Sequence, residues 1–336
     1  MGYREIRPGN LFRNYSVSFM SYHNWSHEAL DDMWSLDSWH RARLRGSYSL
    51  NANAELLNYW NVRTSASYSP EAMSRSATRG GPMMVDPAST RLTLNVSSDR
   101  RKQVSVGANV EIGDDHIGEG GSRQIRADIR VRPSDNVEVS VTPRWETSRS
   151  GNQYVTATST LAYDPTFGSR YLFADLERRS FSMVTRLDWT FSPTLSLQLY
   201  AQPLLSSGDY VRYKQLAEAQ TYDFLGFQPG TGQVVDGGVE CTGICELDGT
   251  QHVDFDQDGR ADYSFSDRDF NVRSLIGNAV VRWEYRPGST IYFVWQRRQI
   301  DRANVGDFDF GRDREALFNA PADNRFIVKV NYWLGL

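Results

Sequence analysis

The stretch RQIRADIRVRPSDNVEVSVTPRWE, residues 123–146, alternates between apolar and polar or charged side chains on both sides of a Pro-Ser-Asp-Asn turn. Successive side chains of a β-strand point to opposite faces, so a period of two is typical of strands. The apolar set is Ile125, Ala127, Ile129, Val131, Val137, Val139, Val141 and Trp145. The set between them includes Arg126, Asp128, Arg130, Arg132, Glu138, Arg144 and Glu146. The stretch therefore predicts a hairpin with one apolar face and one charged face.

The same alternation recurs along the chain, in residues 41–56, 102–112, 181–191 and 325–334. Short turns such as Ser192-Pro193-Thr194 separate some segments, and long polar loops such as 206–266 separate others. Tight turns at one end and long loops at the other are the layout of an outer-membrane barrel. We expect one domain over residues 1–336: an all-β, antiparallel, up-and-down transmembrane β-barrel of about twelve strands, with no long helix.

Composition narrows the class of protein. The net charge of −4 gives no basic excess, so no nucleic-acid partner is predicted. No apolar run approaches the roughly 20 residues of a membrane-spanning helix. A mean hydropathy of −0.54 remains compatible with a transmembrane barrel, because alternating strands average to a polar composition.

The alternative is a soluble carbohydrate-binding β-sandwich, whose strands also alternate. Long strands, aromatic residues near strand ends and stacked charges on the polar faces favour the barrel, whose apolar face would contact outer-membrane lipid. The charged residues expected to face the lumen are Arg41, Arg43, Arg45, Arg126, Arg130, Arg144, Arg186, Glu138, Glu146 and Asp188. This basic excess would favour anions in an open lumen, whereas ion pairing between neighbouring strands, the favoured interpretation, would be structural.

One short sequence that is typical of a turn occurs twice in the chain. Arg4-Glu5-Ile6-Arg7-Pro8-Gly9 matches Trp283-Glu284-Tyr285-Arg286-Pro287-Gly288, and Pro-Gly is turn chemistry. A turn needs a strand on both sides, so residues 3–6 are interpreted as the end of a strand. We expect the natural protein to be longer at its N-terminus. We also expect a sheet with two free edges, or a forced smaller barrel, rather than a regular ladder between 11–25 and 323–335.

Residues 170–210 and 269–296, together with Ala77-Thr78-Arg79-Gly80-Gly81-Pro82, carry a family resemblance. They resemble the C-terminal barrel of large bacterial proteins in which a module similar to family 9 carbohydrate-binding domains precedes a barrel of unknown function. The resemblance covers essentially the whole chain and lacks the module. It implies an outer-membrane protein without a catalytic assignment. Surface binding or transport of carbohydrate-related or other small solutes is the function we expect, with no partner protein indicated.

A calcium loop is the sharpest local motif. Asp254, Asp256 and Asp258 alternate, Gly259 allows a sharp turn, Arg260 offers a backbone carbonyl and Asp262 a further carboxylate. The twelfth position holds Phe265 instead of Glu, so Asp262, Asp267 or Asp269 would have to substitute. A solvated acidic loop is the alternative to Ca²⁺.

Two cysteines, Cys241 and Cys245, lie in the same loop. At an oxidising cell surface a disulfide is the favoured interpretation, ahead of free thiols or a metal pair. No catalytic residues are predicted. His23, His27 and His40 gather near the first long loop, but abundant serines make a hydrolase pattern there unspecific.

Overall fold

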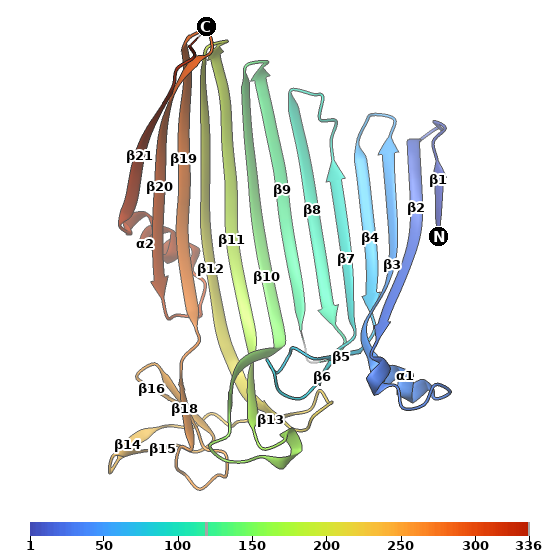
Figure 1. Ribbon diagram of the computed structural model, residues 1–336, viewed down its shortest axis with the longest axis vertical. Coiled ribbons are helices and arrows are strands. Elements are labelled where there is room, and N and C mark those ends of the chain that lie inside the picture. Colours follow the sequence, from blue (N-terminus) through green and yellow to red (C-terminus); the bar gives the residue numbers. More distant parts are fainter. Residues whose placement is uncertain (118–119, 335–336) are drawn as a thin grey trace.

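The computed structural model describes residues 1–117 and 120–334. A single antiparallel sheet dominates this part of the chain (Figure 1). Its twelve long strands are β2 (Phe12–Trp25), β3 (Arg43–Leu56), β4 (Asn61–Ser69), β7 (Ser89–Ser97), β8 (Val104–Asp115), β9 (Gly121–Ser134), β10 (Val137–Thr158), β11 (Arg170–Ser192), β12 (Leu195–Leu216), β19 (Phe270–Arg286), β20 (Ser289–Ala303) and β21 (Ala322–Asn331). Each long strand pairs with the next, which confirms the predicted all-β, up-and-down antiparallel fold.

The sheet has two edges. The short strand β1 (Gly2–Glu5) pairs with β2 at one edge, and β21 forms the other. No ladder joins β2 to β21 within the described residues, as expected from the sequence. Figure 1 shows β1 and β21 at opposite sides of the molecule.

Short turns and long connections lie at opposite ends of the sheet (Figure 1). At the turn between β19 and β20, Pro287 precedes Gly288, which adopts φ +76°. Such a backbone conformation suits glycine, which has no Cβ. At the turn between β3 and β4, Tyr59 adopts φ +65° while the Asn58 side chain accepts a hydrogen bond from the Trp60 amide. These local interactions close the turns without long loops.

Register divides the sheet into two faces. Ile125 lies opposite Trp145, which lies opposite Phe181, and these side chains belong to what we call the apolar face. In the adjacent row of this ladder, Arg126 lies opposite Arg144, and both side chains belong to what we call the charged face. On the apolar face, Ile129 is 42% exposed although it is apolar. The described chain therefore places no second sheet over this face.

Three strands, β10 to β12, extend beyond their neighbours toward the long connections (Figure 1). Register shifts between Ser150 and Gln153 and between Tyr154 and Thr156 mark this extension, and bulges of this kind re-aim side chains. Two small buried clusters form there. One contains Leu172, Val253 and Phe265, and the other contains Phe173, Met84 and Leu216. The extension thus anchors the connections 70–88 and 217–269.

The long connections contain short elements of their own. They are η1 (His27–Ala29), α1 (Leu36–Ala42), β5 (Ala72–Ser74), β6 (Met84–Asp86), η2 (Asp164–Thr166), β13 (Phe224–Gly226), β14 (Gln233–Val235), β15 (Gly238–Glu240), β16 (Ile244–Leu247), β17 (Thr250–Val253), β18 (Tyr263–Ser266) and α2 (Phe310–Asn319). β5 pairs with β6, β14 with β15, and β17 with both β16 and β18. None of the helices in the described residues has the length and apolar character needed to cross a membrane.

The helix α2 was not predicted from the sequence. Asp309 caps it, its side chain accepting a hydrogen bond from the Arg312 amide at 2.7 Å. The segment around it folds back over the apolar face. There the Phe308 ring lies 5.1 Å from that of Trp145, and the Phe310 ring lies 5.4 Å from that of Phe181.

Candidate functional site

The charged face of the sheet gathers almost every residue predicted to face a lumen. Across the ladders Arg126 pairs with Arg144, Ser140 with Arg186, and Glu138 with Asp188. The same face continues through Asn109, Asn95, Arg63 and Asn53 into β3, on which Arg43 and Arg45 share its parity.

Arg41 is the exception. It lies in the last turn of α1, outside the sheet, so the prediction that it belongs to a strand was wrong. Ser35 caps this helix, its side chain accepting from the Ser38 amide at 3.5 Å. A local cap of this kind competes with strand formation, and the alternating pattern alone could not reveal it.

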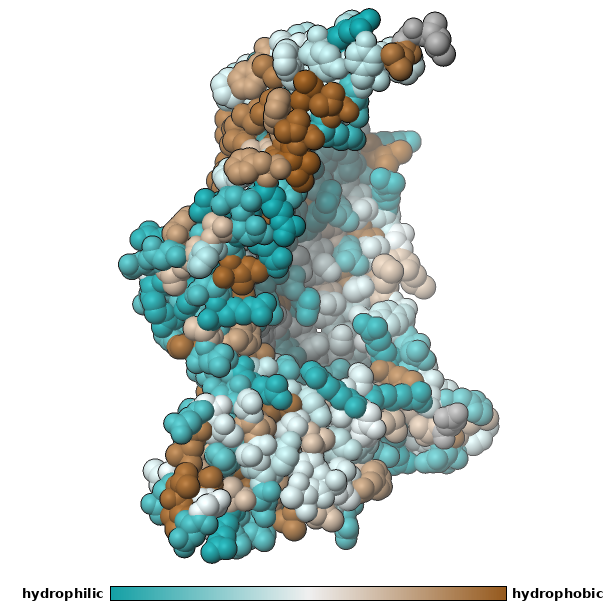
Figure 2. Space-filling model, turned by 60° about the vertical axis from the view of Figure 1, so that its left-hand side comes forward, coloured by the Kyte–Doolittle hydropathy of each residue, from teal (hydrophilic) through white to brown (hydrophobic). Residues whose placement is uncertain are grey.

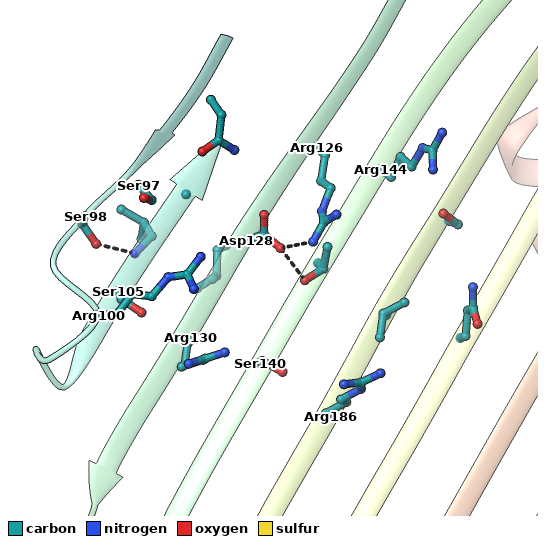
Figure 3. Close-up of a pocket in the computed structure, with 18 residues that line it drawn as sticks. Ser97, Ser98, Arg100, Ser105, Arg126, Asp128, Arg130, Ser140, Arg144 and Arg186 are labelled. Atoms are coloured by element: carbon teal, nitrogen blue, oxygen red, sulfur yellow. Dashed lines mark hydrogen bonds and ion pairs between the residues drawn. The ribbon is translucent and has the colours of Figure 1, made fainter. Parts of the chain in front are cut away.

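A groove of about 480 Å³ lies on the charged face, over β7 to β12 (Figure 3). Small residues contribute much of its lining: Ser97, Ser98, Ser105, Gly107, Ser140, Thr142 and Ser182. Five arginines and one aspartate also line it: Arg100, Arg126, Arg130, Arg144, Arg186 and Asp128. Figure 2 shows a hollow beside the β21 edge whose visible surface is largely hydrophilic or neutral, with hydrophobic side chains gathered above it.

Some of these arginines have carboxylate partners. The Arg126 Nη2 lies 2.7 Å from the Asp128 Oδ1, which also accepts from the Thr142 hydroxyl at 3.1 Å (Figure 3). Arg130 pairs with Glu138 at 3.2 Å, and Arg144 with Glu146 at 2.7 Å.

Arg100 and Arg186 differ from these. Among residues 1–117 and 120–334, no carboxylate oxygen lies within 4.0 Å of either guanidinium. Arg186 instead lies over the Tyr200 ring, 5.4 Å from its centroid. Ion pairing, the interpretation favoured from the sequence, therefore accounts for only part of the positive charge at the groove.

The acidic loop brings together three of its predicted ligands. One carboxylate oxygen from each of Asp254, Asp256 and Asp262 lies within 4.8 Å of the others. Asp258 is not in this group, and its Oδ1 accepts from the Arg260 amide at 2.8 Å. Calcium binding stays a prediction.

Backbone amides already hold the shape of this loop. The buried Asp254 accepts from the Gln257 amide at 2.6 Å and from the Gly259 amide at 2.9 Å. Asp262 accepts from the Phe255 amide at 2.7 Å. A carboxylate oxygen has two lone pairs, so these bonds still allow each oxygen to face a cation.

Cys241 and Cys245 form a disulfide with their Cα atoms 6.0 Å apart. Both sulfur-bearing residues are buried. The bridge closes a tight loop beside the acidic segment, because the Cys241 amide donates to the Gly259 carbonyl at 3.0 Å.

Sequence reasoning missed a buried charge cluster around Asp175. Its carboxylate, 1% exposed, accepts from Arg149 at 3.0 Å, from Arg212 Nε at 2.8 Å and from Lys214 at 2.8 Å. A buried carboxylate needs such partners. The signal was available: Asp175 is a lone acid within the apolar run Tyr171-Leu-Phe-Ala-Asp-Leu176.

Just before β19, Asp269 has a perturbed acidity. Its carboxylate accepts from the Tyr210 amide at 2.7 Å. Burial, reinforced by the carboxylates of Asp267, Asp209 and Glu246, raises the pKa of Asp269 to about 6 despite that hydrogen bond. This group thus titrates in a range where ordinary carboxyls are ionised.

These features define an all-β protein built on a large meander sheet with one apolar and one charged face. The chain belongs to the family described as a domain of unknown function (DUF5916), whose model matches residues 1–336. No curated protein matches it by sequence.

Two solved structures share limited similarity with the chain. One is described as the copper transporter OprC, with a TM-score of 0.46, 10% identity, and coverage of 94% of this chain and 41% of that one. The other is the siderophore receptor PiuA from Acinetobacter baumannii, with a TM-score of 0.44, 7% identity, and coverage of 96% and 46%. The chain therefore spans less than half the length of either structure.

Proposed function

We propose that this sheet is the membrane-spanning part of a bacterial outer-membrane β-barrel protein, and that its charged face lines a polar path or binding surface for small solutes. The proposal includes no enzymatic activity. Carbohydrate-related solutes are a natural class to test, given the family resemblance of the sequence.

The observation that carries the proposal is the spacing of aromatic rows on the apolar face. Near the short turns, Val137 lies opposite Trp189; toward the loops, Trp145 lies opposite Phe181. The stretches Val137–Trp145 and Phe181–Trp189 are both nine residues long. A tilted transmembrane strand needs about 9–11 residues, and aromatic residues mark both interfaces of such a span.

On β9 to β11, charge on the apolar face begins directly beyond the upper aromatic row. In the next row toward the loops, Arg123 lies opposite Thr147, which lies opposite Arg179. Within the band, Val106 and Ile129 are 43% and 42% exposed. Apolar side chains in water at this density would favour aggregation, whereas lipid would cover them.

Cell fractionation tests this proposal. We expect the protein in the outer-membrane fraction, resistant to extraction by urea or carbonate and released by detergent. Recovery in the soluble periplasm without detergent would contradict the proposal and favour the soluble β-sandwich alternative. An unrelated soluble periplasmic protein from the same cells provides the control for lysis.

A further inference from the structure

The geometry points to a ligand class for the groove on the charged face: a small hydroxylated anion, of the sugar-phosphate or sugar-acid kind. This inference rests on the proposed function, because it assumes that the charged face meets solute rather than a packed interior. It goes beyond that function by assigning the charge and the size of the solute.

The groove carries positive charge that its carboxylates do not fully compensate. Five arginines and one aspartate line the groove, and the partners Glu138 and Glu146 offset part of the excess. Arg100 and Arg186 have no carboxylate within 4.0 Å in the described part of the chain. The Tyr200 ring beside Arg186 can orient its guanidinium but carries no charge to neutralise it.

Two arginines of the groove lie opposite each other on neighbouring strands. Arg126 and Arg144 are direct cross-strand partners on the charged face. Like charges in this relation repel and destabilise the pair of strands. Each has one carboxylate partner, Asp128 and Glu146 respectively, and the two ion pairs point along their own strands rather than between them. An anion bound between the guanidinium groups would relieve the repulsion through charge-assisted hydrogen bonds.

The polar lining of the groove suits the uncharged part of the ligand. Ser105 of β8, Ser140 and Thr142 of β10, and Ser182 of β11 present hydroxyl groups to the groove from three strands. Hydroxyl groups both donate and accept, so they suit a ligand that carries several hydroxyls. The volume of about 480 Å³ lies in the range of pockets that take small molecules.

Asp128 adds selectivity within the groove. Its carboxylate already accepts from Arg126 and from Thr142. Its remaining lone pairs can accept a hydroxyl proton of the ligand but repel a second anionic group. The groove is thereby suited to a ligand with its negative charge at one end and hydroxyls at the other.

Calorimetric titration of the full chain in detergent micelles tests this assignment, with glucose 6-phosphate, glucose and inorganic phosphate as probes. We expect glucose 6-phosphate to bind and glucose not to bind measurably. Inorganic phosphate should bind more weakly than glucose 6-phosphate. The affinity should fall as salt increases, because exposed charges are screened.

Substitutions locate the site. Arg186→Gln and Arg100→Gln should each weaken glucose 6-phosphate binding about tenfold or more, as expected for loss of a charge-assisted hydrogen bond. Arg325→Gln is the matched control, because Arg325 lies on the same face, opposite Gln296 at the other end of the sheet. Each variant is checked for an unchanged melting temperature, and Arg186→Lys, which keeps the charge, should restore part of the affinity.

Several results would overturn the assignment. They are equal binding of glucose and glucose 6-phosphate, no binding of either, inorganic phosphate binding as tightly as the sugar phosphate, or an equal loss in Arg325→Gln. Fractionation is measured separately, so a membrane protein that fails this titration refutes the ligand class alone. A protein found in the periplasm refutes the proposed function.

Discussion

The Arg273 guanidinium and the Asp313 carboxylate lie 2.9 Å apart and are almost wholly shielded from solvent. Arg273 belongs to β19 and Asp313 to α2, so this pair fastens the β20–β21 connection to the sheet. Asn271 donates to both oxygens of Asp313 at 3.1 Å, and Arg312 donates to one of them at 3.0 Å. The helix is thus held by a satisfied buried charge rather than by its own propensity.

Removing that carboxylate should release the connection. Asp313→Ala leaves Asp301 as the remaining carboxylate partner of the buried Arg273 and removes the acceptor of Asn271 and Arg312. The cost should therefore be below the value of about 3–5 kcal/mol expected when a buried charge loses every partner. We expect new protease cleavage within 304–321 and a lower denaturation midpoint. Asp323→Ala is the control, because Asp323 and Arg325 form an exposed pair at 3.1 Å that contributes about 1 kcal/mol or less. Equal effects of the two substitutions would contradict this account.

The anchoring of the 217–269 connection should depend on pH through Asp269. Its pKa is raised in the folded protein to about 6, mainly by burial, so folding favours the protonated carboxyl. Its contribution to stability is therefore full below about pH 4 and is lost as the pH rises through 6. We expect protease resistance of the connection to fall from pH 4 to pH 7, and Asp269→Asn to flatten that fall. An Asn variant with the wild-type pH profile would show that other groups control it.

Calcium should protect the acidic loop from protease. With Asp254, Asp256 and Asp262 gathered within 4.8 Å, a bound cation would order residues 236–270 against protease. Asp256→Asn should abolish the difference between calcium and chelator. Asp248→Asn, in the β16–β17 turn outside the group, should leave it intact. Identical cleavage with calcium and with chelator in the unaltered protein would contradict the predicted calcium site.

A charged side chain introduced on the apolar face should be destabilising, whereas one introduced on the charged face should be tolerated. Ile129→Arg places a cation within the aromatic-bounded band, where arginine costs about 2–4 kcal/mol at the membrane midplane. Gln296→Arg is the comparison, because Gln296 lies on the charged face in the ladder row of Arg325. We expect less Ile129→Arg protein in the outer membrane and normal levels of Gln296→Arg. Equal recovery of both would argue against lipid on the apolar face.

Alternation revealed most of the sheet because it runs through most of the long strands, with few register shifts. The predicted strands near 11–25 and 323–335 correspond to β2 and β21, and the twelve expected strands are the twelve long ones. What the sequence could not show depends on tertiary contacts. The helix α2 is held by Arg273 of a distant strand, and Arg41 lies in a helix that a single serine caps.

The candidate sites, too, were only partly predictable from the sequence, because tertiary contacts decide which residues meet. Spacing found Asp254 and Asp256, and loop closure rather than spacing added Asp262 and left out Asp258. The charged face was predictable strand by strand, but the groove was not, because its arginines come from separate strands whose register only the fold sets. Residues 206–216, which were expected to begin a long loop, belong to β12. A register shift in the β11–β12 ladder changes which face each side chain takes and so hides the alternation there.

The ladders from β7 to β9, and from β12 to β19, show no register shift within the paired residues. Gaining or losing one residue inside such a strand would turn every following side chain to the opposite face. Heritable changes in length are therefore expected to be confined to the loops, or to occur within strands two residues at a time. In such a strand, the odd or even position of a residue decides which face its side chain takes. The number of residues in each strand is therefore constrained as well as their identity.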